Sequence, residues 1–313
     1  MNTELRVVRA ADVAERPSDE TPWLIEGLWG AGGVGVIGGS PKVCKSWLAL
    51  EMAVAVASGR PCLGRYAVPV QGPAIVYAAE DAPPSVRERL SHLAEARGAD
   101  FAALDVGLII EPSLRLDRAQ DVARLRATLE RRRPRLLVLD PYVRLQSGDE
   151  NSAMEVSAIL STLRELSRTF ECAIALVHHA RKGTGDEPGQ ALRGSSDFYA
   201  WADSLLHLRR TREGLVLAIE HRAAASPPPV GLTLVTDAGP LRLELRSMPA
   251  VAVEPALGER IVSALQESGS QRHRALRESL HVRDEHLTAT LRELEAAGRI
   301  ARTPEGWRVT AAP

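Results

Sequence analysis

The sequence has few cysteines and almost no net charge, and each shortage excludes a class of protein. Its 313 residues include only three cysteines and no C-x-x-C pair, which excludes a disulfide framework and a zinc cluster built from paired cysteines. The formal net charge is -1, so the chain as a whole is not a binder of polyanions, and any contact with nucleic acid must come from local patches. A reducing cytoplasm is the expected location.

The sequence also lacks the apolar stretches that export and membrane insertion require. The first 20 residues are rich in charge and have no apolar signal core. No run of about 18 apolar residues occurs anywhere, so we expect no membrane span and no membrane partner. Internal repeats and low-complexity segments are absent as well.

Strand and helix patterns alternate over most of the chain. Short apolar runs indicate buried strands within 33–42, 73–81, 106–111, 135–145 and 172–182. Helical periodicity or a continuous apolar surface predicts helices at 46–59, 83–98, 118–133 and 152–170. Strands that alternate with helices indicate an α/β fold with a mostly parallel sheet. After residue 200 the strands are short and linked by turns, so we expect the sheet to end in antiparallel hairpins.

Composition divides the chain into four parts. Residues 1–22 predict a polar N-terminal lead-in, and 23–247 a large α/β domain. Two prolines and the lack of a clear period indicate a linker at 248–257, and 258–313 is long enough to form a small separate domain.

The small domain has the pattern of a winged helix-turn-helix. Helices are expected at 258–268, 273–280 and 283–298, and a two-strand ribbon with a Pro-Glu-Gly turn at 299–310. In such a domain the third helix enters the major groove and the wing touches the DNA backbone. The candidate DNA-binding residues are Arg283, His286, Thr288, Arg292 and Arg302. Acidic residues on the same helix keep a second reading open, in which the domain contacts a protein.

The stretch GGSPKVCKSW, residues 38–47, is nearly a phosphate-binding loop. Gly39, Lys45 and Ser46 fit the pattern G-x-x-x-x-G-K-[ST], but Cys44 takes the place of the second glycine. A strand before the loop and a helix after it are the context that such a loop requires; the alternative is an ordinary glycine turn. The candidate ATP-binding residues are Gly39, Ser40, Pro41, Lys42, Val43, Cys44, Lys45, Ser46 and Trp47.

Each part of this loop has an expected task. Backbone N–H groups would surround the β- and γ-phosphates at the helix N-terminus. Lys45 would place a positive charge on the same oxygens, and the Ser46 hydroxyl would bind Mg²⁺. The cofactors expected are therefore ATP and Mg²⁺.

Polar residues also follow three other predicted strands, and the carboxyl ends of parallel strands form the ligand-binding edge of such a sheet. Asp140 would hold Mg²⁺ through water, unless it is only a turn residue. Glu80 would orient and deprotonate the attacking water, whereas Asp81 suits a helix start. His178 or His179 would sense the γ-phosphate; a metal site is disfavoured because further spaced ligands are missing.

Five segments in this order resemble the RecA-like ATPases of the RepA hexameric helicase type, relatives of DnaB and KaiC. They are PWLIEGL…GVGVIGGSPKVCKSWLALEMAVAVASG, VYAAEDAPPSVRERL, LLVLDPYVRL, VHHARK and LRGSSDFYAWADSLLHL, spread over about residues 20–245. The resemblance implies a RecA-like three-layer core.

The same resemblance implies roles for single residues. Glu80 matches the catalytic glutamate, Asp140 the Walker B acid, and His178 or His179 the histidine that contacts the phosphate. Arg193 matches an arginine near the subunit boundary that acts in trans on a neighbour's nucleotide. An arginine in trans makes activity depend on a homo-oligomer, such as a hexameric ring.

Cys44 is the departure from this pattern. Glycine lets the loop turn tightly without a β-carbon near the phosphates, so we expect cysteine to permit binding with lower affinity. A thiol at a helix N-terminus beside Lys45 is also expected to have a depressed pKa and to be open to oxidation, unless it is merely an inert small residue.

The favoured function is an oligomeric, Mg²⁺-dependent ATPase that acts on DNA, a helicase or loader in the replication of a plasmid, phage or mobile element. Two alternatives stay open. One is a nucleotide-sensing DNA-binding regulator with weak turnover, and the other is a KaiC-like signalling ATPase whose small domain contacts a protein.

Overall fold

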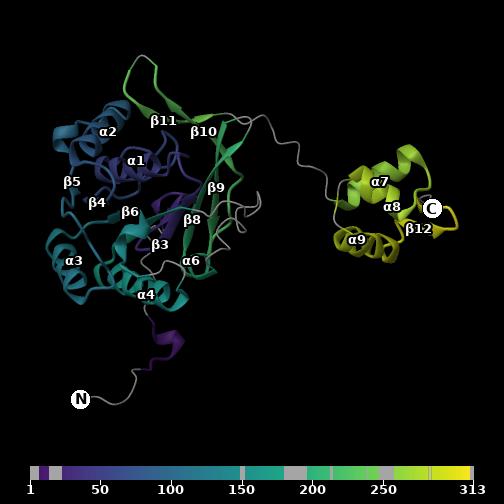
Figure 1. The fold of residues 1–313 in the computed structure, drawn as a ribbon, viewed down its shortest axis with the longest axis horizontal. Helices are drawn as coiled ribbons and strands as arrows, with labels where there is room; N and C mark the ends of the chain where they lie inside the picture. Colours follow the sequence, from purple (N-terminus) through teal and green to yellow (C-terminus); the bar gives the residue numbers. More distant parts are fainter. Residues whose placement is uncertain are drawn as a thin grey trace. The chain divides into compact units, whose positions relative to one another are not determined.

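The structure, a computed structural model, describes residues 7–13, 23–148, 152–179, 196–211, 214–237, 239–246, 257–280, 282 and 284–310. The chain divides into two compact units, residues 1–247 and 248–313, which are described separately (Figure 1). Within the described ranges, no helix has both the length and the apolar character needed to cross a membrane.

A nine-stranded mixed sheet forms the centre of the first unit, in the order β11-β10-β9-β8-β3-β7-β6-β4-β5. Its strands are β3 (Val34–Gly39), β4 (Ala74–Ala78), β5 (Val106–Leu108), β6 (Leu136–Asp140), β7 (Ala173–His179), β8 (Ser204–Thr211), β9 (Gly214–His221), β10 (Val230–Val235) and β11 (Arg242–Arg246). From β5 to β8 every neighbouring pair is parallel. β8 is parallel to β3 and antiparallel to β9, and from there the sheet continues as antiparallel hairpins. The sequence-based prediction of a mostly parallel sheet with antiparallel hairpins at one end is confirmed.

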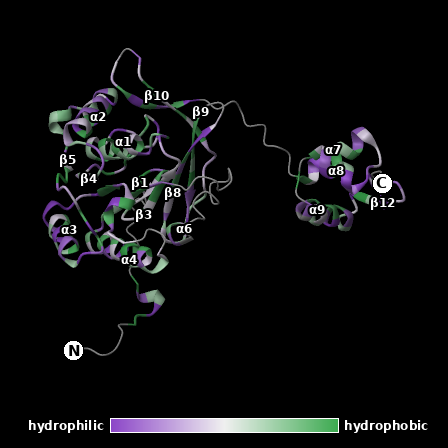
Figure 2. Cartoon of the chain, viewed as in Figure 1, coloured by the Kyte–Doolittle hydropathy of each residue, from purple (hydrophilic) through white to green (hydrophobic). Residues whose placement is uncertain are grey.

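Helices cover both faces of this sheet and make three layers (Figure 1). α1 (Lys45–Ser58) and α2 (Pro83–Ala96) pack on one face, where alternate strand residues such as Ile37 and Val76 meet them. α3 (Ala119–Arg132), α4 (Ala153–Phe170) and α6 (Ser196–Trp201) belong to the other face. α3 carries hydrophilic and hydrophobic residues side by side, as a helix with one buried stripe does (Figure 2).

α1 is the most enclosed helix of its layer. Eleven of its 14 residues are buried, which agrees with the apolar residues around most of its circumference. It ends at Gly59, which adopts a left-handed conformation with φ 68° and matches the helix stop that the sequence predicts.

A buried ion pair fixes the middle of α1. The Glu51 side chain is fully buried; one carboxylate oxygen accepts from Arg97 Nε at 2.6 Å and from the backbone N–H of Leu63 at 2.7 Å. Arg97 also donates to the carbonyl of Leu243 on β11. Burial raises the pKa of Glu51, and the charge of Arg97 opposes that rise.

Several short elements were not predicted from the sequence. They are β1 (Trp23–Ile25), β2 (Trp29–Gly30), α6 and the 3₁₀ turns η1 (Ala10–Asp12), η2 (Phe101–Ala103) and η3 (Tyr142–Leu145). The β1–β2 hairpin is too short to show a period, and its formation follows from burial: Leu24, Ile25, Leu28 and Trp29 are almost completely enclosed. The predicted lead-in, 1–22, is described only at residues 7–13.

The second unit contains three helices and a β-hairpin. These are α7 (Leu257–Ser268), α8 (His273–Leu280), α9 (Asp284–Ala296), β12 (Ile300–Thr303) and β13 (Gly306–Val309). An isolated bridge joins Gln271 to Trp307, and the unit has its own small hydrophobic core around Ile261, Leu276 and Leu291. Residues 248–256 of the predicted linker lie outside the described residues.

Candidate functional site

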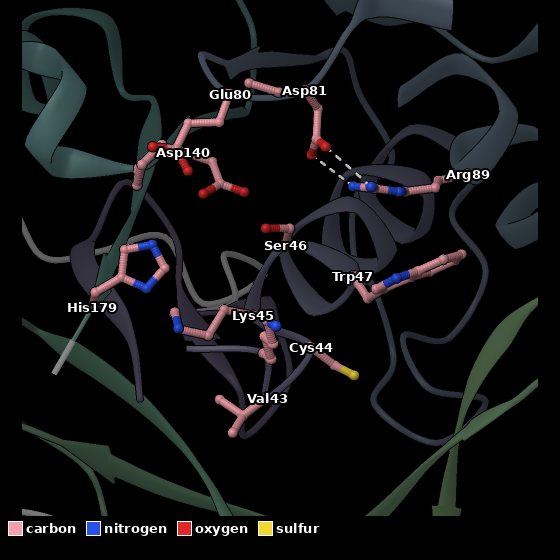
Figure 3. Close-up of a pocket in the computed structure, with 13 residues that line it drawn as sticks. Val43, Cys44, Lys45, Ser46, Trp47, Glu80, Asp81, Arg89, Asp140 and His179 are labelled. Atoms are coloured by element: carbon pink, nitrogen blue, oxygen red, sulfur yellow. Dashed lines mark hydrogen bonds and ion pairs between the residues drawn. The ribbon is translucent and has the colours of Figure 1, made fainter. Parts of the chain in front are cut away.

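A cavity of about 350 Å³ lies at the carboxyl edge of the parallel strands (Figure 3). It is bounded by the loop between β3 and α1 and by the ends of β4, β6 and β7. The residues that line it are Lys42, Val43, Cys44, Lys45, Ser46, Trp47, Ala78, Glu80, Asp81, Arg89, Asp140, Pro141 and His179. Most of the residues that the sequence singled out are therefore brought together in one place.

The loop from Gly39 to Cys44 has an unusual backbone. Lys42 and Cys44 both have φ of 64°, in the left-handed region, and Cys44 is the N-cap of α1. Chains with alternating left-handed residues turn successive N–H groups inward and make anion-binding concavities. Gly39 is required at the loop's start, because an added β-carbon would lie 2.2 Å from the carbonyl oxygen of Leu208 on β8.

Lys45 lies inside this loop and is buried. Its Nζ donates to the carbonyl oxygens of Gly39 at 2.9 Å and Ser40 at 2.7 Å. Burial lowers the pKa of Lys45 to about 8, while the charge of Asp140 opposes the shift. The ammonium is thus partly desolvated and held at the centre of the loop.

Asp140, at the end of β6, faces Ser46 at the start of α1 (Figure 3). Burial raises the pKa of Asp140 to about 6; hydrogen bonding with Ser46 and the charge of Lys45 lower it, and the neighbouring carboxylates Asp81 and Glu80 raise it. A buried carboxylate beside a hydroxyl, with two more carboxylates close by, is an oxygen donor set that suits Mg²⁺. The residues therefore fit the metal that the sequence implies.

Glu80 lines the cavity, but its carboxylate already has a partner. Arg144, in the turn after β6, donates from Nε to Glu80 Oε1 at 2.8 Å, and both side chains are about half exposed. Asp81 also lines the cavity and receives two hydrogen bonds from Arg89, at 2.6 and 3.0 Å. Asp81 was expected only to start a helix, yet Ala82 is the N-cap of α2 and Asp81 faces the cavity.

The two histidines of β7 have different surroundings. His179 is exposed and lines the cavity, beside Gly39 in the parallel register of β3 and β7. His178 stacks on Phe198 with ring centroids 4.5 Å apart and meets Tyr142 edge-on at 5.9 Å. Of the two alternatives that the sequence left open, the geometry favours His179 as the group that faces a ligand.

The expectation of a depressed thiol pKa at Cys44 is wrong. Burial raises the pKa of Cys44, and the opposing charges of Arg210 and Lys45 are too weak to reverse the shift. The thiol at this helix start is therefore not activated, and the reading of Cys44 as a small unreactive residue holds.

Three arginines of this region were missed in the sequence. Arg89 holds Asp81, Arg144 holds Glu80, and Arg210 on β8 donates to the carbonyl of Lys42 in the loop at 3.4 Å. Arginines are common on this chain, and nothing in their spacing separates these three from the others. Arg193, the arginine expected to act in trans, lies outside the described residues.

The residues expected to bind DNA lie on the second unit. His286 and Arg292 are exposed on α9, and Arg302 is exposed on β12, with its guanidinium 5.9 Å from the ring centroid of Trp307. Thr288 is half-buried, and its hydroxyl hydrogen-bonds to His273 on α8 at 3.2 Å. Arg283 is outside the described residues.

The fold and the loop define a RecA-like α/β ATPase domain of the P-loop type. The solved ATPase domain of a helicase superposes on this chain with a TM-score of 0.51 at 14% sequence identity, over 68% of this chain and 85% of that one. At this identity the likeness concerns the fold, and it confirms the expected RecA-like core.

The chain belongs to the AAA domain family, which matches residues 2–185, more than half of its length. A comparison with curated proteins finds no match. Membership of this family supports the expectation that the chain uses a nucleotide, with Mg²⁺ as the usual companion of such a site.

Proposed function

We propose that the chain hydrolyses ATP with Mg²⁺ in the cavity behind the β3–α1 loop. The observation that carries this proposal is the convergence of the loop with Lys45, Asp140, Glu80 and His179, which come from separate strands, around one space of about 350 Å³. A triphosphate requires such a mixture of N–H groups, one buried cation and several carboxylates.

Each residue has a distinct task in this proposal. Lys45 exchanges the carbonyls of its own loop for the β- and γ-phosphate oxygens, and the loop N–H groups surround the same oxygens. Ser46 and Asp140 would hold Mg²⁺, which neutralises charge on the phosphates when bound. Glu80 orients the attacking water and accepts its proton, which requires it to leave Arg144. His179 donates to the γ-phosphate.

We further propose that the chain acts on DNA as a homo-oligomer of the RepA type, with an arginine finger at Arg193. The support here is the ordered set of five motifs. Unit 248–313 is proposed to be a winged helix, because three helices precede a hairpin and Gln271 bridges to Trp307 like a third strand. Exposed Arg292 and Arg302 supply charge for phosphate contacts.

An ATPase assay with and without single-stranded DNA, paired with a mass measurement of the assembly, tests the proposal. We expect turnover that DNA stimulates, an oligomeric mass, and loss of nucleotide binding in Lys45→Ala. Retained ATP affinity in that variant contradicts the site. For the second unit, Arg292→Ala should reduce the salt slope of DNA binding by about 1, as the loss of one phosphate contact does.

One observation favours the first alternative, a nucleotide-sensing DNA-binding regulator with weak turnover. The ion pair with Arg144 holds the carboxylate of Glu80, the residue needed for hydrolysis. ATP binding without turnover, together with sequence-specific DNA binding, identifies this regulator.

A second observation favours the KaiC-like alternative. Asp284 at the start of α9 pairs with Arg277 and His273, so part of the basic surface is already neutralised. A second unit that binds a protein and not DNA would support that reading.

A further inference from the structure

The cavity has two chemically different sides (Figure 3). One side carries Lys45, Asp140 and His179, which the proposed hydrolysis uses for phosphate and metal. On the other side lie Trp47 and Arg89, which that chemistry leaves without a task. A triphosphate seated on the loop has a ribose and a base beyond its α-phosphate, and these parts must extend away from the catalytic side.

Trp47 and Arg89 form a rigid pair of flat groups. Trp47 is half-buried on the first turn of α1 and packs against the core between α1 and the sheet. The guanidinium of Arg89, from α2, lies 5.8 Å from the centroid of the Trp47 ring. Both terminal nitrogens of Arg89 donate to Asp81, at 2.6 and 3.0 Å, so the plane of the guanidinium is fixed.

We propose that Trp47 and Arg89 form the base-binding side of the site, a stacking platform for the purine of a nucleoside triphosphate. The inference rests on the proposed function, since it names the substrate class of the same cavity. Aromatic rings and guanidinium planes both stack on nucleobases, and a base is bound by such groups with little regard to its identity.

The platform provides little hydrogen bonding to distinguish the bases. Among the residues described on this side of the cavity, Asp81 is the group that could read an exocyclic amine, and each of its oxygens already accepts from Arg89. Stacking depends on ring area, so adenine and guanine should bind alike and pyrimidines more weakly. We therefore expect ATP and GTP affinities within about fivefold of each other and CTP weaker than both.

Calorimetric titration with ATP, GTP, CTP and inorganic tripolyphosphate, each with Mg²⁺, separates base from phosphate recognition. In Trp47→Leu we expect the affinity for ATP and GTP to fall about tenfold, as the loss of one stacked base contact does. Tripolyphosphate affinity should stay within about twofold of the wild type, because it has no base. Trp47→Phe keeps an aromatic face and should retain most of the ATP affinity.

Arg87→Ala is the matched control. Arg87 comes from the same helix as Arg89 and lies over an aromatic ring in the same way, 5.2 Å from the centroid of Phe101, but it lines a different groove. This variant should leave all four affinities unchanged. Thermal melts of each variant establish that it is folded.

Three results overturn the platform while leaving ATP hydrolysis intact: unchanged ATP affinity in Trp47→Leu, an equal loss of tripolyphosphate affinity in that variant, or a wild-type preference between ATP and GTP above about a hundredfold. The first places the base elsewhere, the second gives Trp47 a role in shaping the loop, and the third requires a hydrogen-bonding reader. A wild-type chain that binds neither ATP nor tripolyphosphate overturns the proposed function itself, and the platform with it.

Discussion

Replacing Cys44 by glycine should stabilise the first unit, although it removes side-chain contacts. Cys44 has φ 64° and ψ 26°, a left-handed conformation that costs an L-residue about 1–2 kcal/mol. Glycine adopts it freely but gains about 0.4–1 kcal/mol of conformational entropy in the unfolded chain. The difference leaves Cys44→Gly more stable by about 0.5–1 kcal/mol, or about 1–3 °C in the melting temperature of a unit of this size.

Thermal unfolding followed by calorimetry or circular dichroism, without nucleotide, measures this effect. Cys44→Ala is the necessary companion, because alanine removes the thiol and keeps the β-carbon, and with it the backbone cost. We expect Cys44→Ala to melt at or slightly below the wild-type temperature, since the Cys44 side chain packs against the core of the α1 face.

Two outcomes refute the reasoning. If Cys44→Ala gains as much stability as Cys44→Gly, the thiol and not the backbone is the source of the cost. If Cys44→Gly melts below the wild type, the contacts of the side chain outweigh the left-handed conformation, and cysteine is then a favourable residue at this position.

Three further variants test the charged groups. Asp140→Asn should stabilise the nucleotide-free chain at pH 7.5 by up to about 3 kcal/mol in urea unfolding, because a carboxyl whose pKa rises to about 6 costs stability progressively from pH 3.8 to 6 and fully above it; at about pH 4 the gain should vanish. Arg144→Ala should raise basal ATP turnover by freeing Glu80, with a change in stability below about 1 kcal/mol since the ion pair is half exposed; phosphate release and a melt measure the two, and unchanged turnover contradicts the role of the pair. Arg97→Ala should cost about 3–5 kcal/mol in urea unfolding, because it leaves Glu51 buried and unpaired; a loss below about 1 kcal/mol refutes that burial argument.

The sequence predicted the layers of the first unit because hydrophobic pattern decides them. The run of buried residues in β3 and the all-round apolar character of α1 leave few other arrangements, and Gly59 marks the end of that helix. The positions of Lys45 and Asp140 followed directly, since both are fixed by backbone that the pattern had already assigned. Strand ends in a parallel sheet meet at one edge, so the location of the cavity was predictable as well.

Side-chain partners could not be predicted in the same way. His178 and His179 must point to opposite faces of β7, but the sequence does not state which face carries Phe198 and which faces the loop. The pairing of Glu80 with Arg144 joins residues 64 positions apart on two loops. The pKa of Cys44 depended on whether burial or nearby charge is larger, and only the three-dimensional surroundings decide that.

The charged groups of the site share one property that bears on how a nucleotide binds. Lys45 donates to two carbonyls of its own loop, Glu80 pairs with Arg144, and Asp140 has a pKa raised to about 6 by burial. A triphosphate must therefore replace hydrogen bonds that Lys45 already makes, while Mg²⁺ favours ionised Asp140 against the effect of burial. Part of the interaction energy is spent on this exchange, so affinity will be lower than the number of contacts suggests. Glu80 is the exception, because phosphate binding does not by itself break its pair with Arg144. Hydrolysis then depends on a separate event that draws Arg144 away, and a polyanion such as DNA has the charge to do so.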